Sequence, residues 1–159
     1  MSHYAVVEVQ YNDKAMLVEA LVNAGFSRDQ IEVHEDPQTL KNYNGTLTRV
    51  GASDPRFAGG DKAHVIIRQK HIGRLCNDYG IYVDTVKGSR EFVCDWARNN
   101  TQDCIVNPVV KKDGGFGKWS KRLKREYAAA IGTQQFHDQG LIPERVDAPD
   151  GSVYVYANC

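Results

Sequence analysis

The chain has 159 residues, of which 42% are hydrophobic and 25% are charged, and this composition is typical of a globular protein rather than a disordered or fibrous one. A chain of this length is expected to form a single domain, residues 1–159. Its longest wholly apolar run, 127–131, is far shorter than the ~20 residues that cross a bilayer, and its first residues lack the basic flank and apolar core of a signal peptide. We therefore expect a cytoplasmic protein with no membrane partner.

Charge is balanced overall and concentrated locally. Twenty basic and twenty acidic residues give a net charge of zero, so long-range attraction to nucleic acid is not expected of the whole chain. Residues 111–125, however, hold seven basic residues and one Asp, a local net charge of +6. The four cysteines lack the close spacing of structural zinc sites, and we expect reduced thiols and neither a metal nor another cofactor.

The first third of the chain predicts a strand, a helix and a second strand. Apolar and polar residues alternate over 5–11, as in a strand with one buried face. Apolar residues then recur at helical spacing up to Ala24, and this helix is capped by Asn12 or Asp13 and ended by Gly25. Residues 31–35 read as a short strand.

The middle third predicts extended structure. Asn44-Gly45 is typical of a tight hairpin turn, and 51–60 is expected to be an exposed loop. Residues 63–69 predict a strand, and 81–86 and 91–96 predict a hairpin. Within its second strand, Phe92, Cys94 and Trp96 share one face, so burial of that face would place the Cys94 thiol in the core.

The last third predicts a polar loop over 99–118, a helix and a closing hairpin. The helix is expected from Lys118 to Ile131, with an apolar side, a cationic outer side, and an end or kink at Gly132. Strands at 141–148 and 152–157 then flank a turn. The order of elements predicts an α+β fold, a mainly antiparallel sheet with two helices packed on one face. The other face is then solvated, covered by a long loop, or used by a partner.

One candidate site is the glycine-rich segment that opens the basic helix. Backbone N–H groups at a helix start, together with lysines, bind phosphate, and Phe116, Trp119 or the tyrosines of the closing hairpin are available to stack on bases. The segment is not a P-loop, because Lys112 stands where that motif needs Gly and Trp119 stands where it needs Ser or Thr. A flexible loop and a solvated lysine face are the alternatives. The candidate anion-binding residues are Gly115, Gly117, Lys118, Lys121, Lys124 and Arg125.

A second candidate is an interaction surface formed by tyrosines, which supply rigid amphipathic contact area. Its candidates are Tyr43, Tyr82, Tyr154 and Tyr156, each of which also fits a half-buried position in a sheet. We expect a non-enzymatic binding or accessory protein that acts through a protein partner or self-association. The alternative is nucleotide or nucleic-acid binding at 114–125.

An enzyme would need a nucleophile, a base and an orienting acid, and none of the available residues lies in a recognisable motif. The candidates are Cys76 and Cys94 as nucleophile, His64, His71 and His137 as base, and Asp78, Asp84 and Asp95 as acid.

The chain resembles a family of uncharacterised reading frames of plastids and cyanobacteria, the ycf thirty-five type, which has bacterial and phage members. The resemblance spans nearly the whole chain and rests on the order of short motifs: Met1-Ser2-His3, Asn42-Tyr43-Asn44-Gly45, the 62–68 strand, the 79–96 hairpin, the helix around Tyr127 and Asp150-Gly151. The loops at 51–61 and 99–117 are longer than in that family. The resemblance implies an accessory protein that is sometimes found with ring-forming ATPases. It implies a location in the plastid stroma, in a bacterium or in the cytoplasm of a phage-infected host. It implies no catalytic residues.

Overall fold

The computed structural model describes residues 4–9, 11–94 and 105–157. Five strands form an antiparallel sheet in the order β1-β5-β4-β3-β2, and two more form a separate hairpin. The strands are β1 (Tyr4–Val9), β2 (Glu32–Thr39), β3 (Lys62–Ile67), β4 (Tyr79–Tyr82), β5 (Ser89–Cys94), β6 (Pro143–Asp147) and β7 (Val153–Ala157). The helices are α1 (Lys14–Asn23), α2 (Gln69–Ile72), α4 (Pro108–Asp113) and α5 (Phe116–Asp138), with 3-10 turns at Arg28–Gln30 and Pro55–Phe57. The α+β fold is confirmed.

Helix α1 begins and ends where the sequence predicts. The Asp13 side chain accepts a hydrogen bond from the Met16 N–H at 3.1 Å and so satisfies one of the free amides of the first turn. At the other end Gly25 has a φ of +115°, a conformation that costs other residues energy, and the Phe26 N–H returns to the Leu21 carbonyl.

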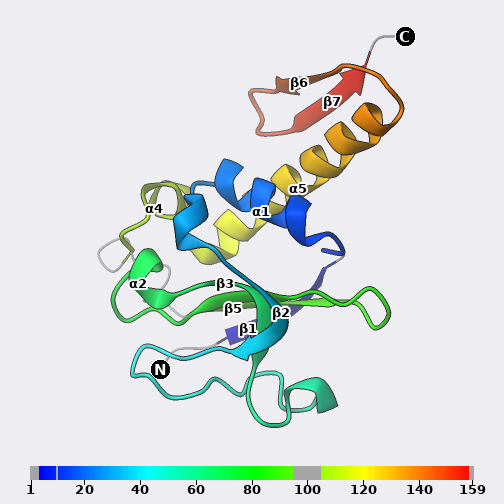
Figure 1. Ribbon diagram of the computed structural model, residues 1–159. Coiled ribbons are helices and arrows are strands. Elements are labelled where there is room, and N and C mark those ends of the chain that lie inside the picture. The colour runs from blue at the N-terminus through cyan, green and yellow to red at the C-terminus, as the bar shows by residue number, and fades with distance from the viewer. Residues whose placement is uncertain (1–3, 10, 95–104, 158–159) are drawn as a thin grey trace.

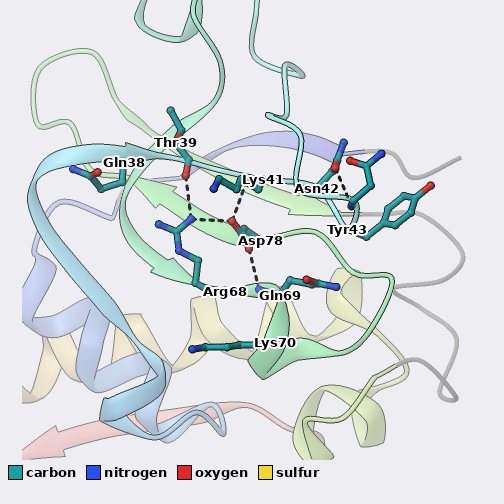
Figure 2. Close-up of a pocket in the computed structure, with 11 residues that line it drawn as sticks. Gln38, Thr39, Lys41, Asn42, Tyr43, Arg68, Gln69, Lys70 and Asp78 are labelled. Carbon is teal, nitrogen blue, oxygen red and sulfur yellow. Dashed lines mark hydrogen bonds and ion pairs between the residues drawn. The ribbon is translucent and has the colours of Figure 1, made fainter.

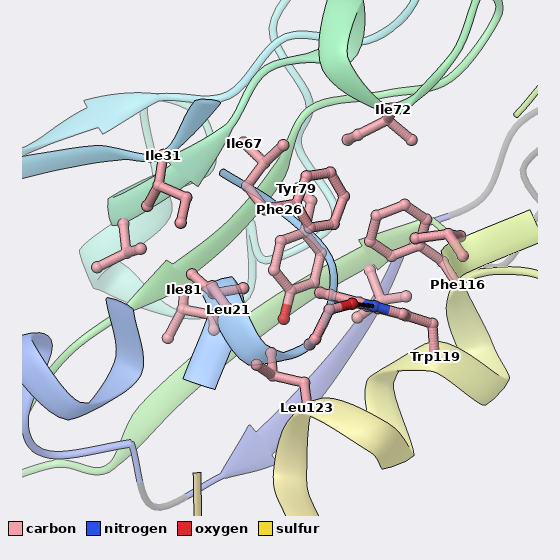
Figure 3. Packing of buried hydrophobic residues seen from close by; sticks show 14 of the residues in the cluster. Leu21, Phe26, Ile31, Ile67, Ile72, Tyr79, Ile81, Phe116, Trp119 and Leu123 are labelled. Carbon is pink, nitrogen blue, oxygen red and sulfur yellow. Dashed lines mark hydrogen bonds between the residues drawn. The ribbon is translucent and has the colours of Figure 1, made fainter. Parts of the chain in front are cut away.

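Helices α1 and α5 cover the same face of the sheet, as predicted (Figure 1). Trp119 of α5 is fully buried, and its Nε1 donates to the Ala24 carbonyl at 2.8 Å (Figure 3). The Trp119 ring meets Phe26 and Tyr79 edge to face. The backbone N–H groups of Asn12 and Asp13, just before α1, donate to the Tyr127 hydroxyl of α5. These contacts join the two helices to each other and to the sheet.

The opposite face of the sheet is covered by the long segment 40–61. Leu40 and Phe57 are fully buried there against Ile66 and Phe92. Phe57 packs edge to face on Phe92, with ring centroids 5.0 Å apart. The expectation that 51–60 is simply exposed is therefore wrong at Phe57, because the 3-10 turn at 55–57 directs this ring into the core. Of the three alternatives for the second face, the long loop is the one observed.

Helix α5 is longer than predicted and starts earlier. It runs from Phe116 to Asp138, and Gly132 neither ends nor breaks it. A Cβ at Gly132 would lie 3.8 Å from the Cβ of Val155, an ordinary contact distance, so β7 packs on the helix at this position. Two short helices, α2 and α4, were not predicted. The second half of α5 extends beyond the sheet and carries the β6–β7 hairpin, and we call this projection the arm (Figure 1).

Strand β5 is buried on both faces. Phe92 packs under the 40–61 segment, whereas Glu91 and Val93 are buried on the helix side. The Ser120 hydroxyl of α5 donates to a Glu91 carboxylate oxygen at 2.5 Å. Burial raises the pKa of Glu91 above its ordinary value. The prediction for the Cys94 side chain and Trp96 lies outside the described residues.

Candidate functional site

The basic segment predicted from the sequence forms an exposed, unneutralised surface. Its one acid, Asp113, is bound at both oxygens by Arg122, at 2.6 Å each. The other cations are exposed and form no ion pair with any residue that the structure describes. We call them the basic surface: Lys111 and Lys112 of α4, and Lys118, Lys121, Lys124 and Arg125 of α5. The outward side of the first half of α5 carries no acid, since Glu126 is buried.

The glycines of this segment build a joint between two helices. Gly114, with a φ of +89°, ends α4, and Gly115, with a φ of +122°, precedes α5. Gly115 is buried, and its N–H already donates to the Val110 carbonyl at 3.1 Å. Phe116 is buried in the core, as is Trp119, so neither ring is open for stacking on a base. Of the predicted anion-binding residues, Gly117 and the four cations are accessible.

The four tyrosines do not form one surface. Tyr82 is half-buried against Phe57 and His64, and Tyr43 lies in a turn on another part of the molecule. Tyr154 and Tyr156 lie together on the outward side of the hairpin, where they are 57% and 42% exposed.

The arm joins these two tyrosines to the basic helix. Arg145 of β6 binds both carboxylate oxygens of buried Glu126, at 2.6 Å each, and this pair fastens the hairpin to α5. A Cβ at Gly151, in the hairpin turn, would lie 4.0 Å from the Arg125 guanidinium. The basic surface therefore borders the hairpin. The outward side of the hairpin also exposes Val146, and Ile142 is exposed just before β6.

Two of the candidate catalytic residues, His64 and Asp84, form hydrogen bonds that hold the structure together. The Nδ1 of buried His64 accepts the Val83 N–H at 3.0 Å, and burial lowers the pKa of this imidazole. Asp84 accepts two backbone N–H groups at one oxygen and the Arg56 guanidinium at the other. His137 is exposed near the end of α5, far from the sheet. Cys76 is buried and His71 half-buried, whereas the Cys94 side chain and Asp95 lie outside the described residues.

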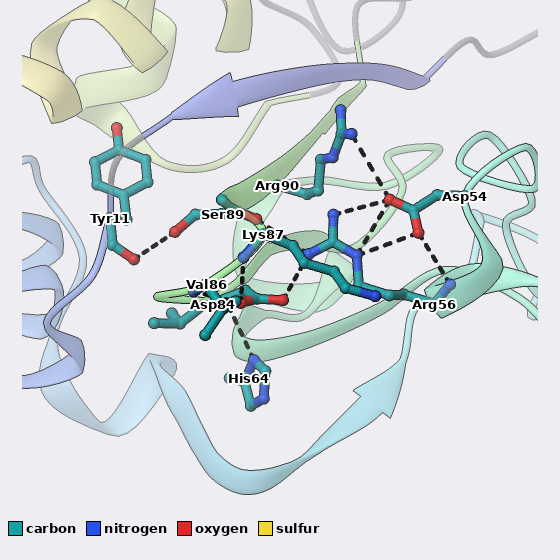
Figure 4. Close-up of polar contacts among 11 residues, drawn as sticks. Tyr11, Asp54, Arg56, His64, Asp84, Val86, Lys87, Ser89 and Arg90 are labelled. Atoms are coloured by element: carbon teal, nitrogen blue, oxygen red, sulfur yellow. Dashed lines mark hydrogen bonds and ion pairs between the residues drawn. The ribbon is translucent and has the colours of Figure 1, made fainter.

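Arg56 binds two acidic groups on the face of the sheet that the segment 40–61 covers. Its guanidinium binds Asp54 and Asp84 and lies 5.2 Å from the centre of the Tyr82 ring (Figure 4). Arg90 adds a second cation 3.7 Å from Asp54. The hydrogen bonds from Arg56 lower the pKa of Asp54 to about 2. Because this arginine is already saturated by carboxylates, we assign it a structural role.

A groove with a volume of about 760 Å³ opens between the end of β2, the turn at 42–45 and α2. Figure 2 shows Arg68 and Asp78 at its centre and Lys70 beside them. Lys41 and Tyr43 line it as well. Sequence reasoning did not find this groove, because its charged residues come from three separate segments and form no motif.

The described residues hold no cluster of three His, Cys, Asp or Glu side chains able to bind a metal ion. They also include no helix that is both long and apolar enough to span a membrane. In the comparisons with known proteins, no family model, no curated protein and no solved structure matches the chain. The resemblance to the plastid reading-frame family thus stays a prediction.

Proposed function

We propose that this protein is a non-enzymatic binding module that holds single-stranded nucleic acid along the basic surface. The observation that carries the proposal is the set of exposed cations on α4 and α5, none paired with an acid in the described part of the chain. Cations clustered along one helix are the electrostatic footprint of phosphate-backbone binding.

The neighbouring hairpin favours a single strand over a duplex. Tyr154 and Tyr156 are exposed on the outward side of the hairpin, whose turn at Gly151 lies near Arg125, and exposed aromatic rings stack on unpaired bases. In a duplex those bases are already stacked on each other. The basic surface then contributes affinity and the tyrosines contribute the preference for unpaired bases.

Charge reversal tests the proposal. In a fluorescence anisotropy titration with a labelled oligothymidylate at low salt, the variant K121E/K124E/R125E should lose binding. The matched control R49E/R74E/K87E changes three exposed cations elsewhere by the same total charge and should bind like the unaltered protein. Equal losses in both variants would show only a general charge effect, and no binding by the unaltered protein would refute the proposal.

We propose self-association through the arm as a second function, because the outward side of the hairpin exposes apolar and aromatic side chains around a single acid, Glu144, whose carboxylate accepts the Tyr156 hydroxyl at 2.7 Å. Ile142 is 83% exposed and Val146 45%, next to the two tyrosines. Such a patch on a projecting hairpin fits a second copy of the same hairpin, since a two-fold contact pairs a surface with itself. Sedimentation velocity should show a concentration-dependent dimer that Y154S/Y156S abolishes. A monomer at all concentrations would exclude it.

A further inference from the structure

We propose that the groove beside α2 is a binding site for a small ligand that carries a sugar phosphate group. The groove lies on the edge of the sheet formed by β2 and β3, and its lining shares no residue with the basic surface. The proposal is therefore independent of nucleic-acid binding by α4 and α5. Its volume of about 760 Å³ lies within the range of small-molecule sites.

One buried carboxylate arranges the cations of the groove. Asp78, which is 4% exposed, accepts the Gln69 N–H at one oxygen and both the Lys41 N–H and the Arg68 guanidinium at the other, each at 2.9 Å. The Asp78 N–H in turn donates to the Lys41 carbonyl at 2.9 Å. These bonds fix the backbone at Lys41 and immediately before Lys70. Arg68 is thus fixed at the centre of the groove, and Lys41 and Lys70 extend from fixed backbone positions in its lining (Figure 2).

The positive charges of the groove that no acid neutralises favour an anionic ligand. Lys41 and Lys70 are exposed, and neither ammonium group forms an ion pair with a described residue. Asp78, the one acid in the lining, has its charge offset by Arg68, which also binds Glu32. A phosphate group accepts hydrogen bonds at several oxygens from different directions, as two lysines on different segments provide.

The rest of the lining suits hydroxyl groups. The Gln69 side chain places an amide on the wall that bonds to no described residue, and an amide both donates to and accepts from sugar hydroxyls. The Gln38 amide already donates to the Asp36 carbonyl, and the Asn42 amide is bonded within the turn at 42–46. Tyr43 lies at the end of the groove away from Gln38 (Figure 2). Sugar phosphate is the chemistry shared by free sugar phosphates and nucleotides, so a test has to separate these two sources.

Backbone amide chemical shifts of the labelled protein, followed during titration with ribose 5-phosphate and separately with AMP, test the site. We expect saturable shifts at residues of the groove and a loss of affinity of about 100-fold in K41A/K70A, since each lost charge-assisted bond costs about tenfold. The control K111A/K112A, which removes two exposed lysines from α4, should bind normally. Tighter binding of AMP would assign the site to nucleotides, and equal or weaker binding would assign it to free sugar phosphates.

Three results would overturn the proposal: no saturable shifts with either probe, shifts confined to α4 and α5, or the same affinity in K41A/K70A as in the unaltered protein. Both lysines are exposed, so their replacement by alanine is not expected to unfold the chain. The dispersion of the amide spectrum of each variant reports this directly.

Discussion

Replacing Phe57 by alanine should destabilise the protein strongly, although this residue lies in a segment with few regular elements. Its side chain is fully buried and makes edge-to-face contacts with Phe92 and Tyr82, at 5.0 and 5.1 Å. Phenylalanine-to-alanine changes in cores cost about 3–5 kcal/mol, and two aromatic pairs place Phe57 in the upper part of this range. At about 2–4 °C for each kcal/mol, a cost of about 4–5 kcal/mol should lower the midpoint of thermal unfolding by roughly 8–20 °C.

Urea unfolding followed by circular dichroism measures the effect. The control is Val50→Ala, which truncates an exposed apolar side chain of the same segment and should change the free energy of unfolding by less than about 0.5 kcal/mol. If Phe57→Ala were as mild as Val50→Ala, the segment 40–61 would not cover the sheet. Phe57 would then not be buried against Ile66 and Phe92.

Three further changes test other contacts. Gly80→Ala would place a Cβ 2.7 Å from the Cβ of Ala63 and should cost about 1–3 kcal/mol in urea unfolding; a neutral effect would refute this close approach. Because burial raises the pKa of Glu91 above 4.5, its ionisation costs stability as pH rises, so Glu91→Gln should stabilise the protein at about pH 8 and have little effect near pH 4. The opposite trend in unfolding curves at the two pH values would contradict the cost of burying the ionised Glu91 carboxylate. Arg145→Ala leaves buried Glu126 without its partner and should speed proteolysis within the hairpin; unchanged cleavage would show that the arm is held otherwise.

Local chemistry accounts for the elements that the sequence predicts well. The cap at Asp13, the glycine at the end of α1 and the closing hairpin each depend on residues within a few positions of one another. The basic side of α5 is equally readable, since its charges recur at helical spacing. These are the features that need no knowledge of tertiary contacts.

The features missed depend on contacts between distant segments. Gly132 is a helix breaker by local preference, yet it lies inside α5, at a point where β7 packs on the helix through Val155. Phe57 lies two residues after Pro55 in a polar segment, and only its contact with Phe92 shows that it is core. The groove depends on Asp78 binding residues near 41 and 68, which no sequence spacing reveals.

The salt dependence of oligothymidylate binding tests the central claim, that nucleic acid lies along the basic surface, most directly. If all six cations contact phosphates, the slope of log K against log salt should approach about −4, a loss of about 250-fold between 50 and 200 mM. The variant K121A/K124A/R125A should show a slope of about −2 and a loss of about 15-fold over the same interval. An identical slope for both proteins would place the nucleic acid elsewhere and contradict the account.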